Sequence, residues 1–169
     1  MLSLSRRTDE SRSSMDSGNE GERLYQEALR YDLGDVDEQH DYEKAVQLYH
    51  QAAEKGHVEA QYNLGICYQG TPLSLRKQTF SSSPSYIKPS TEGDGVEQDN
   101  EKAFRFYLRA ANQMHKQAQY YVGLFYKEGK GVDQNIYEAI HWFRKAAGQG
   151  MKPPYLIDST NKVYPNLLC

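Results

Sequence analysis

The stretch that decides the fold occurs three times. It reads DYEKAVQLYHQAAEKGH at residues 41–57, DNEKAFRFYLRAANQMH at residues 99–115 and NIYEAIHWFRKAAGQGM at residues 135–151. In each copy an alanine, an aromatic ring and an Ala-Ala pair recur at i, i+4, i+7 and i+8, which is one face of a helix with 3.6 residues per turn. In the middle copy these are Ala103, Tyr107, Ala110 and Ala111. The three stretches predict three helices with the same buried face.

Polar and flexible residues mark both ends of these helices. A residue that suits the N-cap stands ahead of each one: Asp41, Asp99 and Asn135. Such a side chain accepts hydrogen bonds from free backbone N–H groups of the first turn. Gly56 and Gly150 follow two of the helices, where glycine tolerates a positive φ. Met114 holds that place in the middle copy, and we expect its chain reversal to differ.

A second pattern precedes the later copies. It reads AQYNLGICYQ at residues 60–69 and AQYYVGLFYK at residues 118–127, and its apolar stripe again has the helical period. Gly65 and Gly123 lie inside this helix, where glycine costs about 1 kcal/mol relative to alanine. Finding glycine twice in register predicts that another helix passes too close for a Cβ atom.

The spacing of the copies gives the length of the repeat. The first two copies are 58 residues apart and the last two are 36 apart, as are EGDGVE at 92–97 and EGKGVD at 128–133. The period is therefore 36, and 22 residues have been added at about 70–91. We expect an array at residues 21–150, made of about three helix pairs at 21–56, 57–114 and 115–150.

These motifs resemble the Sel-1-like repeat, a relative of the tetratricopeptide repeat. The third unit supplies the pattern as Ala118, Val122, Gly123, Tyr126, Gly129, Gly131, Val132, Asn135, Ala139, Ala146 and Ala147. The middle unit supplies it as Ala60, Leu64, Gly65, Tyr68, Gly93, Gly95, Val96, Asp99, Ala103, Ala110 and Ala111, once the addition is skipped. The resemblance implies an all-α fold, an α/α superhelix (solenoid) with a concave binding face and no catalytic residues.

Family members are mostly adaptors, so the resemblance implies a protein-interaction adaptor or scaffold that is not an enzyme. One bacterial branch with paired cysteines suggests an alternative, a β-lactamase-like hydrolase. We disfavour it because Cys67 and Cys169 are the only cysteines and no such pairs occur. A third possibility is a shortened form that competes with a longer protein for its partner.

The helices predicted at residues 60–69 and 118–127 come first in their repeat units. Five of their residues lie off the packing stripe and are candidates for partner contact: Tyr62, Asn63, Tyr120, Tyr121 and Lys127. Each of them could instead pack against a neighbouring unit, and the sequence leaves both roles open. The partner is expected to be a protein or peptide, and its identity is not encoded in the pattern.

The remaining segments have a different composition. Residues 70–91 are rich in Ser and Pro, carry three basic residues and no acidic one, and predict a disordered loop. The loop is either a regulatory segment, with Ser83 as a phosphorylation site, or an alternative-exon or gene-model product. Residues 1–20 also predict disorder. Residues 151–169 carry a Pro-Pro pair near their start that blocks a further helix, and form either a cap for the array or the end of a truncated product.

Composition excludes several other classes of protein. The net charge of −3 gives no indication of a nucleic-acid partner. The Gly-rich loops follow predicted helices, unlike nucleotide-binding loops, and the five histidines lack the spacing of metal ligands. We therefore expect no cofactor, no metal and no catalytic residue. No signal peptide or apolar run of about 18 residues occurs, so we expect a cytoplasmic protein without a membrane span. The oligomeric state is not indicated.

Overall fold

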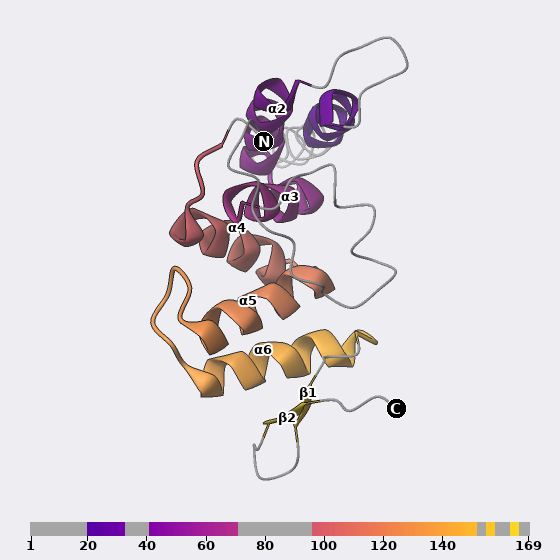
Figure 1. Cartoon of the computed structure of the whole chain (residues 1–169). Coiled ribbons are helices and arrows are strands. Elements are labelled where there is room, and N and C mark those ends of the chain that lie inside the picture. The colour runs from indigo at the N-terminus through magenta and orange to yellow at the C-terminus, as the bar shows by residue number, and fades with distance from the viewer. Residues whose placement is uncertain (1–19, 33–40, 71–95, 152–154, 158–162, 166–169) are drawn as a thin grey trace, which may run out of the picture. The chain divides into compact units, whose positions relative to one another are not determined.

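The computed structural model describes residues 20–32, 41–70 and 96–151, together with the backbone of residues 155–157 and 163–165 (Figure 1). The predictions of disorder before residue 20 and within the 70–91 addition, including Ser83, lie outside the described residues, apart from Glu20 and Gly70 at their edges. The chain divides into two compact units, residues 1–98 and 99–169.

The first unit contains three described helices. They are a helix over residues 20–32, α2 (Tyr42–Glu54) and α3 (Val58–Tyr68). The predicted face of α2 is its buried face, since Ala45, Tyr49 and Ala52 are fully buried and Ala53 is 1% exposed. The Tyr49 hydroxyl donates to Asp32 Oδ2 at 2.7 Å, so α2 is also tied to the end of the helix over residues 20–32.

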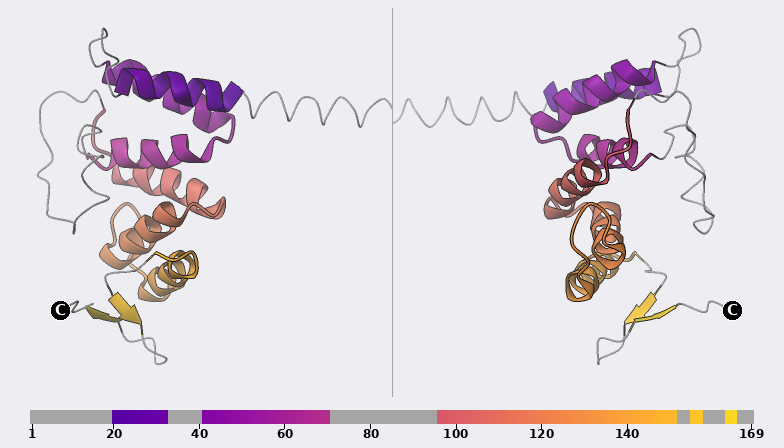
Figure 2. Two further views of the ribbon diagram at one scale, coloured as in Figure 1. Left: turned by 90° about the vertical axis from the view of Figure 1, so that its right-hand side faces the viewer. Right: turned by 60° about the vertical axis from the view of Figure 1, so that its left-hand side comes forward.

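The second unit contains three more helices. They are α4 (Asn100–Asn112), α5 (Lys116–Glu128) and α6 (Ile136–Gly148), and α5 packs against both of the others (Figure 2). Tyr107 of α4 and Phe143 of α6, which correspond to Tyr49 of α2, are 0% and 1% exposed. The aromatic position of the repeat is therefore a core position wherever it occurs.

Two short strands follow α6, and the helical pattern gave no indication of them. They are β1 (Tyr155–Ile157) and β2 (Val163–Pro165). They pair antiparallel, with Leu156 opposite Tyr164. A Pro-Pro pair disfavours the continuation of a helix, which agrees with the extended conformation of residues 155–157.

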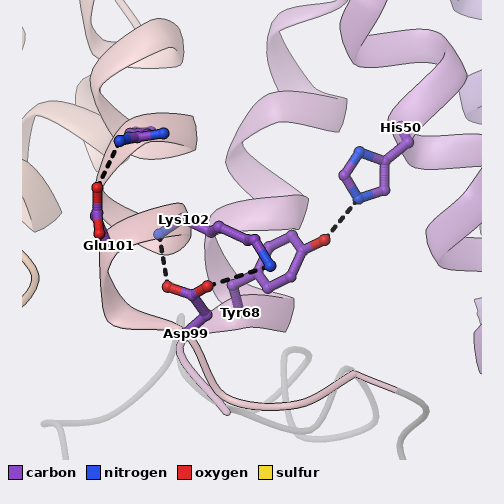
Figure 3. Close-up of polar contacts among 6 residues, drawn as sticks. His50, Tyr68, Asp99, Glu101 and Lys102 are labelled. Carbon is purple, nitrogen blue, oxygen red and sulfur yellow. Dashed lines mark hydrogen bonds and ion pairs between the residues drawn. The ribbon is translucent and has the colours of Figure 1, made fainter.

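The predicted N-caps are confirmed. Asp41 accepts from Lys44 N at 3.0 Å, and Asp99 accepts from Lys102 N at the same distance (Figure 3). Asn135 accepts two hydrogen bonds in the same way from the first turn of α6. The Lys102 backbone N–H holds the pKa of Asp99 below its ordinary value, because it binds the ionised carboxylate.

The prediction for Met114 was wrong. Gly56 and Gly150 have φ of +87° and +79°, as expected, but Met114 also takes the left-handed conformation, with φ of +66°. The next residue closes the same hydrogen bond in each case, from His57 N to Ala52 O and from His115 N to Ala110 O. The turn geometry is therefore retained in the middle copy. Met114 itself is 65% exposed to solvent.

Two glycines of the second unit lie where the structure leaves no room for a side chain. A Cβ atom at Gly123 would lie 2.6 Å from the Phe143 ring of α6, so the predicted close approach of a second helix is confirmed. At Gly131, φ is +62° and a Cβ atom would lie 2.3 Å from the Asn100 carbonyl oxygen. The loop between α5 and α6 is thus held against the start of α4.

Gly70 and Gln98, which flank the stretch containing the rest of the added segment, lie next to each other. A Cβ atom built on Gly70, just after α3, would lie 3.4 Å from the side chain of Gln98. The described residues on the two sides of the stretch 71–95 therefore lie close together.

Candidate functional site

The five predicted contact residues fall into two groups. Tyr62 and Asn63 of α3 are buried, with exposures of 6% and 0%. Tyr120, Tyr121 and Lys127 of α5 are partly exposed. The candidate residues are therefore accessible to a partner on α5 and buried on α3.

The partly exposed side chains of α5 include one stripe, which we call the α5 face: Gln117, Tyr120, Tyr121, Leu124 and Lys127. Their spacing of three and four residues places them on one side of the helix. The opposite side of α5 is core, as shown by Ala118 and Val122, which are fully buried. The centre of the α5 face carries two aromatic rings and a leucine, and its charged residue, Lys127, lies at one end.

The two tyrosine rings of the α5 face pack against buried aromatic rings. Tyr121 stacks on the buried ring of Tyr107, with centroids 4.8 Å apart and an interplanar angle of 7°. Tyr120 meets Tyr121 edge-on at 5.8 Å and lies 5.7 Å from the Phe143 ring. Rings fixed in this way lose little conformational freedom when a ligand covers them. Tyrosine also combines a broad apolar face with a polar tip, which suits a contact surface.

The middle of the equivalent side of α3 is closed. Tyr62, Asn63 and Ile66, which correspond to Tyr120, Tyr121 and Leu124, are each 6% exposed or less. The ends of that side, Glu59 and Gln69, keep exposed surface. The amide oxygen and nitrogen of Asn63 have no hydrogen-bond partner in the described part of the structure. Leaving a buried polar group unsatisfied costs about 1–3 kcal/mol. Sequence reasoning did not foresee this closure, because nothing in the helical period distinguishes α3 from α5.

The end of α3 is also fixed. His50 Nε2 lies 2.9 Å from the Tyr68 hydroxyl, and the two rings meet edge-on (Figure 3). This contact joins α2 to the last turn of α3.

Two equivalent histidines begin α3 and α5. His57 Nδ1 accepts a hydrogen bond from Ala60 N at 3.2 Å, and His115 Nδ1 accepts one from Ala118 N at 3.1 Å. A ring nitrogen that accepts a hydrogen bond carries no proton, so both rings have the proton on Nε2 when neutral. The sequence showed that these positions are equivalent but not that they are N-caps.

His57 makes further contacts that link α3 to the helix over residues 20–32. Its Nε2 lies 2.8 Å from Glu22 Oε2, and the Tyr25 ring stacks on the imidazole at 4.4 Å. The Gln26 side chain and then the His57 ring hold the pKa of Glu22 below its ordinary value by hydrogen bonding. The histidine therefore has a structural role, and within the described residues no group of three or more His, Cys, Asp or Glu side chains could hold a metal ion.

Two buried glutamines, which the sequence analysis did not single out, join consecutive helices. Gln61 Nε2 donates to the Ala53 carbonyl at 3.2 Å, and Gln119 Nε2 donates to the Ala111 carbonyl at 3.1 Å. Both side chains are 1% exposed. The Ala-Gln pair that recurs near the start of α3 and of α5 was the sequence signal that could have identified these glutamines. These bonds fix the angle at which α3 leaves α2 and α5 leaves α4.

The sequence also matches a known family. The model of the Sel1 repeat matches residues 21–57, 58–71, 91–115 and 116–151, which is more than half of the chain. None of the described helices is long and apolar enough to cross a membrane.

Curated relatives carry regulatory and binding names. The chain is 35% identical over 121 residues to chitin synthase regulator SKT5 of Saccharomyces cerevisiae, covering 62% of this chain and 17% of that protein. It is 29% identical over 163 residues to DAP3-binding cell death enhancer 1 of Rattus norvegicus, covering 67% of this chain and 32% of that protein. The chain thus spans a third or less of the length of these relatives.

Solved structures agree on the fold. A Sel1 repeat protein from Oxalobacter formigenes superposes with a TM-score of 0.60 at 28% identity, covering 87% of this chain and 92% of that one. The c5321 antigen of uropathogenic Escherichia coli, which displays the same repeat fold, gives the same score and identity over 89% of this chain and 26% of that one. Helicobacter pylori cysteine rich protein B, at 18% identity and a TM-score of 0.51, shares the fold alone. The α/α solenoid class is therefore confirmed, and the chain belongs to the Sel1 repeat family.

Proposed function

We propose that the protein is a non-catalytic adaptor that binds a protein partner along the α5 face. The observation that carries the proposal is the pair of partly exposed tyrosine rings, Tyr120 and Tyr121, fixed against buried aromatic rings. Membership of a repeat family whose relatives include a chitin synthase regulator and a DAP3-binding protein supports binding over catalysis.

The proposed mechanism is complementarity of shape with a few anchors. A helix or extended segment of the partner lies along α5 and covers the two tyrosine rings and Leu124. Gln117 and Lys127, at the two ends of the stripe, supply polar contacts at the edges. Aromatic residues at the centre of an interface and polar residues at its rim are the usual arrangement.

Tyr62 and Asn63 have a different place in this proposal. Their burial in the described structure makes them packing residues of the compact unit at residues 1–98. Direct contact is assigned to Tyr120, Tyr121 and Lys127. The repeat units at 21–56, 57–114 and 115–150, and a tail at 151–169 that covers the last helix, remain part of the proposal. A cytoplasmic location also remains part of the proposal, because two cysteines, Cys67 and Cys169, do not indicate a disulfide framework.

The test begins with affinity enrichment on the full chain and on a variant lacking residues 70–91, followed by calorimetry with the recovered partner. We expect Tyr120→Ala to weaken binding at least tenfold, because one anchor residue accounts for about 2 kcal/mol or more of binding. Lys116→Ala, an exposed change on the same helix outside the stripe, is the matched control and should leave affinity unchanged. Equal affinities for Tyr120→Ala and wild type, with circular dichroism unchanged, would reject the α5 face.

The 70–91 deletion tests the second half of the proposal, that the segment regulates binding and that Ser83 is modified there. Removal should leave the melting temperature unchanged or raised, and should change the partner's affinity. Unchanged affinity would favour the alternative-exon or gene-model interpretation, and a large loss of helicity would show that the segment is structural.

A further inference from the structure

Tyr137 differs from the other tyrosines of the chain. Among the tyrosines whose side chains are described it alone is exposed, at 79%, whereas the others are buried or partly covered. Its neighbour Ile136 is 43% exposed. With 79% of its surface in solvent, Tyr137 gains little from burial, so core packing does not account for a tyrosine here.

The register of the repeat shows what stands at this position elsewhere. The residues equivalent to Tyr137 are Glu43 in α2 and Glu101 in α4, each in the first turn of its helix. Glu101 forms an ion pair with Arg105, four residues later, at 2.5 Å. In α6 the position four residues after Tyr137 is His141, which is exposed. In α2 that position holds Gln47, so α6 shares a basic side chain here with α4 alone, and it has a phenol in place of the acid.

The position of Tyr137 in α6 also favours a negative charge. It is the second residue of the helix, and its backbone N–H donates to Asn135 Oδ1 at 3.0 Å. Free N–H groups and the helix dipole stabilise anions at this end. The first turn of a helix opens locally at little free-energy cost, which lets the side chain enter another protein's active site. Asp133 and Glu138 give it an acidic flank suited to a basic peptide groove.

We propose that Tyr137 is a phosphorylation site, and that its phosphate pairs with His141 as Glu101 pairs with Arg105. A tyrosine kinase with ATP supplies the group. The Tyr137 Oη–P bond forms, the bond from the γ-phosphorus to the β,γ-bridging oxygen breaks, ADP leaves, and the phenol proton passes to the kinase's base. The phosphate carries close to two negative charges near pH 7 and adds an anion to the exposed ring. Glu138 is adjacent in sequence but does not face the same side of the helix. This inference does not depend on the adaptor function.

The first experiment measures which tyrosine accepts phosphate. The full chain is incubated with MgATP and a broad-specificity tyrosine kinase domain, and the initial rate at each tyrosine is followed by peptide mass spectrometry. We expect Tyr137 to react at least tenfold faster than Tyr42, Tyr120 or Tyr121, and Tyr137→Phe to remove that signal. A faster reaction at Tyr42, Tyr120 or Tyr121 than at Tyr137, or equal rates, would overturn the proposal.

The second experiment measures what the phosphate does. Hydrogen exchange at Ala139 and Ile140 should slow about two- to fivefold on phosphorylation, as expected for an anion at a helix N-terminus. In nuclear magnetic resonance spectra the His141 ring signals should move, and His141→Gln should reduce the slowing of exchange. Unchanged or faster exchange, or unmoved His141 signals, would contradict the proposed pairing.

Discussion

The faces of α3 and α5 begin from nearly the same sequence and end differently. Tyr62 and Asn63 of α3 are buried, while Tyr120 and Tyr121 at the equivalent positions of α5 keep part of their surface in solvent. In α5 the Tyr121 ring stacks on the Tyr107 ring. At the equivalent position of α3, the Asn63 side-chain amide has no hydrogen bond in the described part of the chain. The comparison teaches that the repeat fixes the backbone and the core, while the outer side of each first helix is free to become a surface or to be closed.

The largest expected effect concerns the packing that supports the α5 face. Gly123→Ala places a Cβ atom against the Phe143 ring, which is itself 1% exposed and has little room to move. We expect the free energy of unfolding in urea to fall by about 2–3 kcal/mol, as for overpacked cores.

Gly148→Ala is the matched control for this change. Gly148 is the last residue of α6, and a Cβ atom added there would have nothing within 4 Å, so the change should be neutral or slightly stabilising. Equal losses for the two variants would show that the α5–α6 contact is not close.

The second prediction concerns the closed face of α3. Asn63→Leu should raise the free energy of unfolding by about 1 kcal/mol, because an apolar group of similar size removes the unsatisfied amide. Asn63→Asp should lower it, since a buried carboxylate without a partner costs more than an amide. A loss of stability in Asn63→Leu, measured by thermal and urea unfolding, would mean that the amide is in fact hydrogen-bonded.

A third prediction compares the two histidine caps. His115→Ala should destabilise the protein by about 1 kcal/mol through loss of the cap, and His115→Asn should restore most of it. His57→Ala should cost more than loss of a cap alone, because the Glu22 and Tyr25 contacts are lost as well. Nitrogen chemical shifts of both rings should report the tautomer with the proton on Nε2. The opposite tautomer would contradict both caps.

The smallest effect is expected at the turn between α4 and α5. Met114→Gly should stabilise the protein by about 0.5–1 kcal/mol, because a non-glycine residue at positive φ carries a penalty of about 1–2 kcal/mol that the flexibility of glycine partly offsets. Gly56→Ala, at the corresponding turn between α2 and α3, should have the opposite sign. A change of the same sign in both variants would show that the two turns are not equivalent.

The sequence predicted what depends on local chemistry. The period of small and aromatic residues placed Tyr49 and Tyr107 in the core, and Asp41 and Asp99 at the helix starts. These features follow from helix geometry and capping, which act within a few residues.

What the sequence did not predict depends on contacts across space. The burial of Asn63 and the role of His57 as a cap with a carboxylate partner require neighbours from other helices. The strands β1 and β2 form by pairing two segments that carry no helical period, so no repeat pattern announced them. Met114 shows a related limit. The turn holds it at a positive φ, a conformation that a non-glycine residue rarely adopts by itself.

The meeting of Gly70 and Gln98 has a consequence for how such a chain tolerates change in length. Twenty-seven residues separate them, whereas five separate the equivalent Glu128 and Gln134 in the next copy. Lengthening a closed connection from five to 27 residues raises its closure entropy cost by only about 1.5 kcal/mol, since each doubling adds about 0.6 kcal/mol. Because Gly70 and Gln98 lie next to each other, no helix need shift to admit the extra residues. The junction is thus a natural grafting point, at which a reporter peptide or a small domain could be inserted without redesign of the helices on either side.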